Sequence, residues 1–303
     1  MTDVPGSQYA PDIVPRGQQV RWFTKNLSRK ADITSITLES FDNSVAPTFV
    51  AITAEAGDVV KTAAAASSAP TASAQPKAQS FDWGQGVRTL LVGGGSSHDF
   101  QRWFRLADLA TLQESKGFSA HYTEQYADVP SALQQIDVLC WSANQPQKDT
   151  GLRKAIMDFA DTGKGLVLLH AGNWRLWNDW PEWNRILAGG GSQSHDRYGE
   201  FEVTSIDASH PVMKGVPASF RISDELYHHK QDADGAAAHP LATGRNLATG
   251  KTYPVVWITK HPKARIVNIT LGHDGLSHDH PAYKALLKNA LAWAAGKPVA
   301  AAQ

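Results

Sequence analysis

The stretch Gly163–Trp174 reads GKGLVLLHAGNW, in which an unbroken apolar run, Gly165–Leu169, ends at His170. A run without polar alternation is typical of a strand that is covered on both faces, as in parallel sheets flanked by helices. The small residues after the histidine indicate a sharp turn, similar to the strand-to-helix turn on which α/β enzymes present a nucleophile. The sequence therefore predicts a buried strand that presents an imidazole at its carboxyl end.

Short apolar runs alternate with helical stretches on both sides of this strand. Further strands are predicted at Val87–Val92, Phe118–Tyr122, Ile136–Trp141, Val255–Thr259 and Ile266–Leu271. Helices are predicted at Arg102–Glu114, Leu152–Asp161 and Ala282–Ala295. This order predicts an α/β fold, namely a doubly wound, mainly parallel sheet with helices on both faces. We expect four strands to be parallel neighbours, those that begin at Val87, Ile136, Gly165 and Ile266.

Two segments precede this α/β domain, which we place at residues 81–303. Residues 61–80, KTAAAASSAPTASAQPKAQS, have no periodic apolar face and are typical of a disordered Ala/Ser/Pro linker. Residues 1–60 contain β-branched runs at 33–38 and 47–53, which predict two strands and a turn. Since so few large apolar residues would give a marginal domain, we expect this β-rich segment to dock on the main domain or to belong to a larger β domain.

The composition argues against several partners and locations. Lys and Arg total 29, as do Asp and Glu, so no overall positive field exists to hold nucleic acid. No stretch approaches the roughly 20 apolar residues that cross a bilayer, so no membrane partner is expected. The only cysteine, Cys140, lies in an apolar run and is predicted to be a buried hydrophobe. The chain shows no signal peptide, but a periplasmic or secreted location is favoured over a cytoplasmic one, and the oligomeric state stays open.

Polar residues follow several predicted strands, at the edge where parallel sheets bind ligands. Four of them are catalytic candidates: His98, His170, Glu225 and His273. Five more are candidates for substrate binding: Asp99, Asn173, Trp174, Tyr227 and His228. Imidazole and carboxylate groups transfer protons near neutral pH, which suits acid-base catalysis.

Each of these patterns also has a structural interpretation. The run Gly93–Gly95 lacks the spacing of a phosphate loop and is typical of a tight turn. His170 could cap its strand, and the charged residues at 224–229 could form an exposed loop. Three residues before the last helix are interpreted as capping or surface groups: His278, Asp279 and His280. Four tryptophans could form a sugar-binding platform or part of the core: Trp174, Trp177, Trp180 and Trp183.

The four catalytic candidates are also candidate ligands for a divalent metal. Zinc accepts histidine nitrogens and carboxylate oxygens, and an open coordination position would polarise a sugar carbonyl or hydroxyl group. The tight H-x-x-x-H and C-x-x-C spacings are missing, so a metal-free acid-base site with the same residues stays open and no cofactor is certain.

The ordered set of motifs resembles the trehalose-utilisation (ThuA-like) family over roughly residues 85–297. The resemblance rests on four motifs: VGGGSSHDF (92–100), GKGLVLLHAGNW (163–174), SHPVMKGVPASFRISDELY (209–227) and VNITLGHD (267–274), with a final helix that ends in LAWAAG. It implies the class I glutamine amidotransferase-like fold and a link to disaccharide metabolism, including 3-keto sugars. It also implies the four catalytic candidates as site positions. Amidotransferases carry cysteine where this chain has His170, so glutamine hydrolysis through a thioester is not expected.

Two classes of function follow, both with a small-molecule carbohydrate as partner. The first is an enzyme, a hydrolase, lyase or isomerase that acts on a glycoside or disaccharide by His/Glu acid-base chemistry. A 3-keto sugar would suit it, because the carbonyl acidifies the neighbouring C–H and a modest base can remove that proton. The alternative is a non-catalytic carbohydrate-binding module of a larger secreted protein, with the tryptophans as its platform. We favour the enzyme.

Overall fold

The computed structural model describes residues 8–10, 20–22, 80–174 and 179–299, and the chain divides into two units, Met1–Thr71 and Ala72–Gln303. In the first unit, β1 (Gln8–Ala10) and β2 (Val20–Trp22) pair antiparallel. The sequence analysis did not anticipate these two strands. The strands predicted at 33–38 and 47–53 lie outside the described residues, as does the predicted linker except for its last residue.

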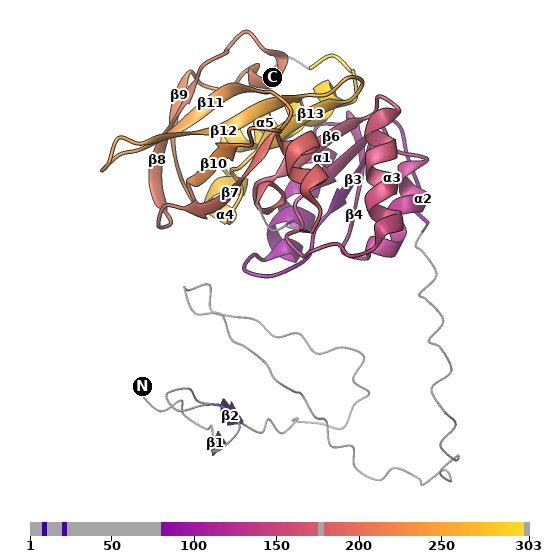
Figure 1. Ribbon diagram of the computed structural model, residues 1–303, viewed down its shortest axis with the longest axis horizontal. Helices are drawn as coiled ribbons and strands as arrows, with labels where there is room; N and C mark the ends of the chain where they lie inside the picture. Colours follow the sequence, from indigo (N-terminus) through magenta and orange to yellow (C-terminus); the bar gives the residue numbers. More distant parts are fainter. Residues whose placement is uncertain (1–7, 11–19, 23–79, 175–178, 300–303) are drawn as a thin grey trace. The chain divides into compact units, whose positions relative to one another are not determined.

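The second unit contains a nine-stranded sheet with the order β4-β3-β5-β6-β13-β12-β11-β8-β9 (Figure 1). Five strands run parallel: β3 (Val87–Val92), β4 (Phe118–Thr123), β5 (Val138–Trp141), β6 (Gly165–Leu169) and β13 (Arg265–Ile269). The four predicted parallel neighbours are therefore adjacent, and their predicted bounds differ from the observed ones by only a few residues. The α/β fold with a parallel sheet is confirmed.

The other half of the sheet is antiparallel. It contains β12 (Thr252–Lys260), β11 (Ala238–Asn246), β8 (Gly199–Ser205) and β9 (Ser219–Asp224). A separate antiparallel ribbon of β7 (Gly190–His195) and β10 (Tyr227–Gln231) packs against β12, where the His229 ring lies 4.1 Å from the Trp257 ring between centroids. Of these antiparallel strands, the sequence analysis anticipated β12 alone.

Helices cover both faces of the parallel half of the sheet. They are α1 (Asp108–Glu114), α2 (Val129–Leu133), α3 (Thr150–Asp161), α4 (Gly275–His278) and α5 (Pro281–Ala294). Further helical segments, which are 3-10 or π helices, are η1 (Phe100–Ala107), η2 (Tyr126–Asp128), η3 (His170–Asn173), η4 (Trp183–Ala188) and η5 (Pro211–Met213). Within the described residues, no helix is long and apolar enough to cross a bilayer.

Each face of the sheet has its own hydrophobic core. On β3, Leu91 joins the core formed with α1 and α5, whereas its neighbour Leu90 joins the core formed with α2, α3 and η4. Side chains alternate between the faces of a strand, so a strand that is apolar at every position requires helices on both sides. The continuous apolar runs in the sequence have this structural cause.

Two of the four tryptophans are core residues. Trp180 is 3% exposed and Trp183 is fully buried, and both pack in the core beside α3. The Trp183 indole also donates to the Gly172 carbonyl at 3.0 Å, below the turn that carries His170. Trp177 lies outside the described residues.

Candidate functional site

His170 occupies a strained position at the end of β6. Its φ of +38° lies in the left-handed region, which residues with a side chain rarely adopt. Two neighbours hold this turn in place. A Cβ on Gly172 would lie 2.5 Å from the Trp141 carbonyl oxygen, so only glycine fits there. The buried Asn173 amide donates to the carbonyls of Leu168 (3.0 Å) and Ile269 (3.2 Å), which joins β6 to β13.

Hydrogen bonds fix the tautomer of His170. Its Nδ1 lies 2.6 Å from the Thr270 carbonyl oxygen, an acceptor, so Nδ1 carries the proton. When the ring is neutral, its lone pair is on Nε2, which lies 3.2 Å from the Tyr227 hydroxyl. The imidazole is fully buried and presents a basic nitrogen toward the neighbouring site residues.

His98 is oriented in the same way on the loop that follows β3. Asn144 clamps this loop by accepting from the Ser96 amide (3.0 Å) and donating to the Ser96 carbonyl (2.8 Å). His98 Nδ1 donates to that carbonyl at 3.1 Å, and its buried Nε2 has no hydrogen-bond partner among the described residues. Burial, together with the charges of His170 and His273, lowers the pKa of His98 to about 3, so this ring stays neutral.

The glycine run before His98 lets the backbone pass close to neighbouring side chains. A Cβ at Gly93 would collide with the Tyr122 ring, and one at Gly95 would collide with Asn144. Gly94 and Gly95 also have positive φ angles, of 107° and 132°.

Glu225 and His273 complete the group. Glu225 Oε2 lies 3.6 Å from His170 Nε2 and 3.2 Å from His273 Nδ1. Burial alone would raise the pKa of Glu225, but hydrogen bonds and charge from the two histidines outweigh it and hold the pKa well below its ordinary value. Burial alone would lower the pKa of His273, but Glu225 outweighs it and raises the pKa.

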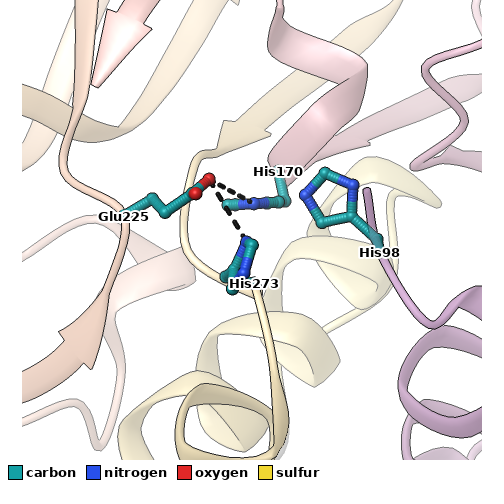
Figure 2. A group of neighbouring side chains, drawn as sticks. All are labelled: His98, His170, Glu225 and His273. Atoms are coloured by element: carbon teal, nitrogen blue, oxygen red, sulfur yellow. Dashed lines mark ion pairs between the residues drawn. The ribbon is translucent and has the colours of Figure 1, made fainter. Parts of the chain in front are cut away.

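The four predicted catalytic residues therefore meet at one point (Figure 2). Each offers one ligand atom, and these atoms all lie within 4.8 Å of one another. The ring centroids of His98 and His170 are 4.8 Å apart, and that of His273 lies 5.0 Å from the first and 5.5 Å from the second. The residues come from four separate segments, after β3, β6, β9 and β13. The expected gathering at the carboxyl edge of the sheet is observed.

A buried carboxylate that the sequence analysis did not select, Asp224, holds two of these residues in place. Its Oδ1 accepts from the backbone amides of Glu225 (2.7 Å) and His273 (3.3 Å), and its Oδ2 accepts from the Gly272 amide (2.7 Å). Full burial raises the pKa of Asp224 despite these hydrogen bonds. Asp224 thus joins the end of β9 to the loop after β13.

The expectation that His278 is a capping or surface residue is wrong. His278 is fully buried, with Nδ1 2.7 Å from Asp108 Oδ1 and Nε2 3.0 Å from the Gly272 carbonyl. Both nitrogens face acceptors, so the ring is an imidazolium, and Asp108 raises its pKa although burial opposes this. The partner lies on α1, far away in the sequence. His280 does cap α5, because its Nδ1 accepts from the Ala282 amide, and Asp279 is exposed.

The five predicted substrate-binding residues occupy different environments. Tyr227 contacts His170, and the half-buried Trp174 lies against Tyr227 with ring centroids 5.1 Å apart. Asp99 is exposed and caps η1 by accepting from the Arg102 amide, and Asn173 is buried beneath the turn. His228 belongs to a hydrogen-bond network with Asp196. Contact of any of them with substrate stays a prediction.

His195 is a site neighbour that the sequence analysis missed. Its Nδ1 lies 3.6 Å from Glu225 Oε1, and its ring centroid lies 5.8 Å from that of Trp174. The residue is exposed, so it lies at the rim of the group. It ends β7, a strand of glycine, serine and glutamine with no apolar signal, so no sequence pattern marked its position.

The donor set fits a divalent cation. Metal-ligating histidines almost always donate their other ring N–H to a carbonyl or carboxylate, and His98 and His170 each donate Nδ1–H to a backbone carbonyl. Their Nε2 lone pairs, with His273 Nδ1 and the Glu225 carboxylate, form the nitrogen and oxygen set that zinc accepts. Cys140 is 1% exposed, and burial holds its pKa well above the ordinary value, as expected for an inert core residue.

The fold and site define an α/β protein whose sheet edge carries three histidines and one glutamate at one point. The family model described as trehalose utilisation (ThuA) matches residues 89–294, which include all four. The chain belongs to this family.

Two solved structures share the fold. A ThuA-like protein from Parabacteroides merdae ATCC 43184 is 23% identical, covers 72% of this chain and 93% of its own, and has a TM-score of 0.63. A ThuA-like protein from Bacteroides uniformis ATCC 8492 is 20% identical, covers 73% and 96%, and has a TM-score of 0.60. No curated protein matches the chain.

Proposed function

We propose that this chain is an enzyme that acts on a glycoside or disaccharide, a 3-keto sugar in particular, at a divalent metal centre formed by His98, His170, Glu225 and His273. The observation that carries the proposal is the convergence of three imidazoles and one carboxylate within 4.8 Å, with two rings held in the tautomer that a metal ligand requires. Zinc is the first candidate, because it accepts this mixed nitrogen and oxygen set.

The chain's own residues would bind the sugar and move its protons. A bound cation would supply a Lewis acid for a sugar carbonyl or hydroxyl oxygen. Glu225 stays ionised because its pKa is held low, so it can balance positive charge in the site. Burial raises the pKa of Tyr227 well above the ordinary value, so its hydroxyl keeps its proton. This hydroxyl can donate a hydrogen bond but does not act as an acid.

The surroundings of the four residues suit a carbohydrate. Trp174 offers a half-buried ring beside Tyr227, and aromatic rings beside polar groups are suited to the flat apolar faces of sugars. The family description, trehalose utilisation, supports the same substrate class. The binding-module alternative loses two of the four tryptophans of its platform, because Trp180 and Trp183 are core residues.

Elemental analysis and an activity screen together test the proposal. Protein purified without a metal-binding tag should contain about one zinc or related ion per chain, and a chelator should abolish turnover of a 3-keto glycoside or its parent sugar. His170→Ala should lose both the metal and the activity. His239→Ala is the matched control, because His239 is an exposed histidine paired with Asp207. Activity that survives chelation would reject the metal, whereas sugar binding without turnover would support the module.

A further inference from the structure

A second chain of polar contacts lies outside the four-residue site, on the ribbon formed by β7 and β10. Ser194 Oγ lies 2.9 Å from His228 Nδ1, and His228 Nε2 lies 2.8 Å from Asp196 Oδ1. Ser194 and Asp196 flank His195, whose ring faces Glu225. Side chains alternate along an extended chain, so the serine and the aspartate share the side opposite to His195.

The charges fix the direction of both hydrogen bonds. Burial alone would raise the pKa of Asp196, but hydrogen bonds from Asn246 and His228 outweigh it and lower the pKa, so the carboxylate is ionised. It therefore accepts the proton of His228 Nε2, and the lone pair of the neutral ring is on Nδ1. The Ser194 hydroxyl then donates to this lone pair, as a serine does toward its general base.

Two further contacts hold the base in place. Asn246 Nδ2 donates to Asp196 Oδ2 at 2.6 Å, which fixes the carboxylate. The His228 ring is stacked on Tyr253 at 4.3 Å between centroids, with 18° between the planes. Exposure is graded along the chain: the side chains of Asp196 and His228 are 24% and 27% exposed, whereas Ser194 is open to solvent. Nucleophilic catalysis requires an accessible nucleophile and a base that a third group orients. Ser194, His228 and Asp196 fit these three roles.

We propose that Ser194 is a base-activated nucleophile that accepts the acyl group of small activated esters, at a site separate from the proposed metal centre. Its oxygen attacks the ester carbonyl carbon while the hydroxyl proton moves to His228 Nδ1. The bond from the carbonyl carbon to the leaving-group oxygen breaks, and a stabilised phenolate departs without needing a proton. His228 releases the first proton to solvent. Water then attacks the acyl-serine and passes its proton to His228, which gives it to the serine oxygen, so that the serine leaves as a hydroxyl and the carboxylic acid is released.

Covalent labelling of the full-length protein tests this inference. A fluorophosphonate probe should form a bond from phosphorus to Ser194 Oγ with loss of fluoride, and peptide mass spectrometry locates the adduct. Ser209 is the matched control, because it is an exposed serine whose hydroxyl contacts a carboxylate, Asp207, at 2.7 Å and no imidazole. We expect one adduct per chain on Ser194, none on Ser209, and labelling that is at least about 100-fold slower in His228→Ala.

Hydrolysis of p-nitrophenyl acetate provides the second measurement. Ser194→Ala changes one exposed side chain and should lower the hydrolysis rate by about 100-fold, while His239→Ala should leave the rate unchanged. Labelling that misses Ser194, equal labelling of the His228→Ala protein, or full hydrolysis by Ser194→Ala would each overturn the inference. Covalent labelling of Ser194 does not depend on metal content, so a failure of the proposed function would leave this outcome unaffected.

Discussion

Single residues position the ligands of the candidate metal centre through their backbones. The Asp224 carboxylate accepts hydrogen bonds from the backbone amides of Glu225, Gly272 and His273. Groups behind metal ligands often govern affinity nearly as strongly as the ligands do. We therefore regard Asp224 as a positioning residue.

Replacing Asp224 with asparagine should weaken zinc binding by about 10–100-fold. The amide group has one acceptor oxygen, and its NH2 would face a backbone N–H donor, so the loop around His273 would shift. Competition with a chromophoric chelator measures the affinity. Asp279→Asn is the control, because Asp279 is exposed. Equal affinities in the two variants would show that Asp224 does not position the site.

Between elements, the buried Asp108–His278 pair joins α1 to the end of α4. Tyr283 on α5 also donates to Asp108 Oδ2, at 3.2 Å. Asp108→Asn should lower the free energy of unfolding by about 3–5 kcal/mol, because it leaves a buried imidazolium without its counterion. Urea denaturation measures the change. Asp158→Asn, in an exposed pair with Lys154, should change it little, and equal losses in both variants would contradict the account.

A second pair joins the starts of β3 and β5 and should respond to pH. Arg88 donates to Asp137 from its backbone amide and its guanidinium group, and these contacts outweigh burial and lower the pKa of the carboxyl. A lowered pKa in the folded state adds stability above the unfolded value of 3.8, and that stability is lost as the pH falls through the folded pKa. The effect should stay below about 1 kcal/mol, since both side chains are partly exposed.

Urea denaturation of the native protein and Asp137→Asn across the acid range checks this prediction. The two proteins should differ at pH 7 and converge toward pH 2. A difference that stays constant across the range would mean that ionisation of Asp137 is not its cause.

At the scale of the whole molecule, the predicted linker at residues 61–80 is open to direct test. Limited proteolysis should cut within residues 61–80 and release a folded fragment that begins near Phe81, because exposed segments of small and polar residues are preferred sites of cleavage. Mass spectrometry identifies the fragment, and circular dichroism reports its fold. A resistant linker, or an unfolded 81–303 fragment, would show that the N-terminal segment belongs to the same core.

The parallel half of the sheet could be predicted from the sequence, and most of the antiparallel half could not. Strands such as β6 are apolar at every position, so they are visible as runs. In β8 polar residues alternate with buried ones, and β11 includes Pro240 and Gly244, which are uncommon in strands. Neither segment contains a continuous apolar run, so neither is recognised as a strand from its sequence.

Three of the candidate ligands, His98, His170 and His273, follow parallel strands, which end at one edge of a sheet, so we could predict that they meet there. Glu225 follows β9 in the antiparallel half, so this argument does not cover it. The residues that hold these ligands in place could not be predicted. His278 pairs with Asp108 across 170 positions of sequence, and Asp224 acts on the backbone of a loop 48 positions away. No local pattern encodes such contacts.

The central claim is that one metal ion lies between the four residues at the sheet edge. The most direct measurement is a crystal structure of the zinc-loaded protein with anomalous data collected on both sides of the zinc absorption edge. We predict a single strong anomalous peak within about 2.0–2.3 Å of nitrogens of His98, His170 and His273 and an oxygen of Glu225. A zinc-loaded crystal with no peak at this point, or with zinc bound only elsewhere, would contradict the account.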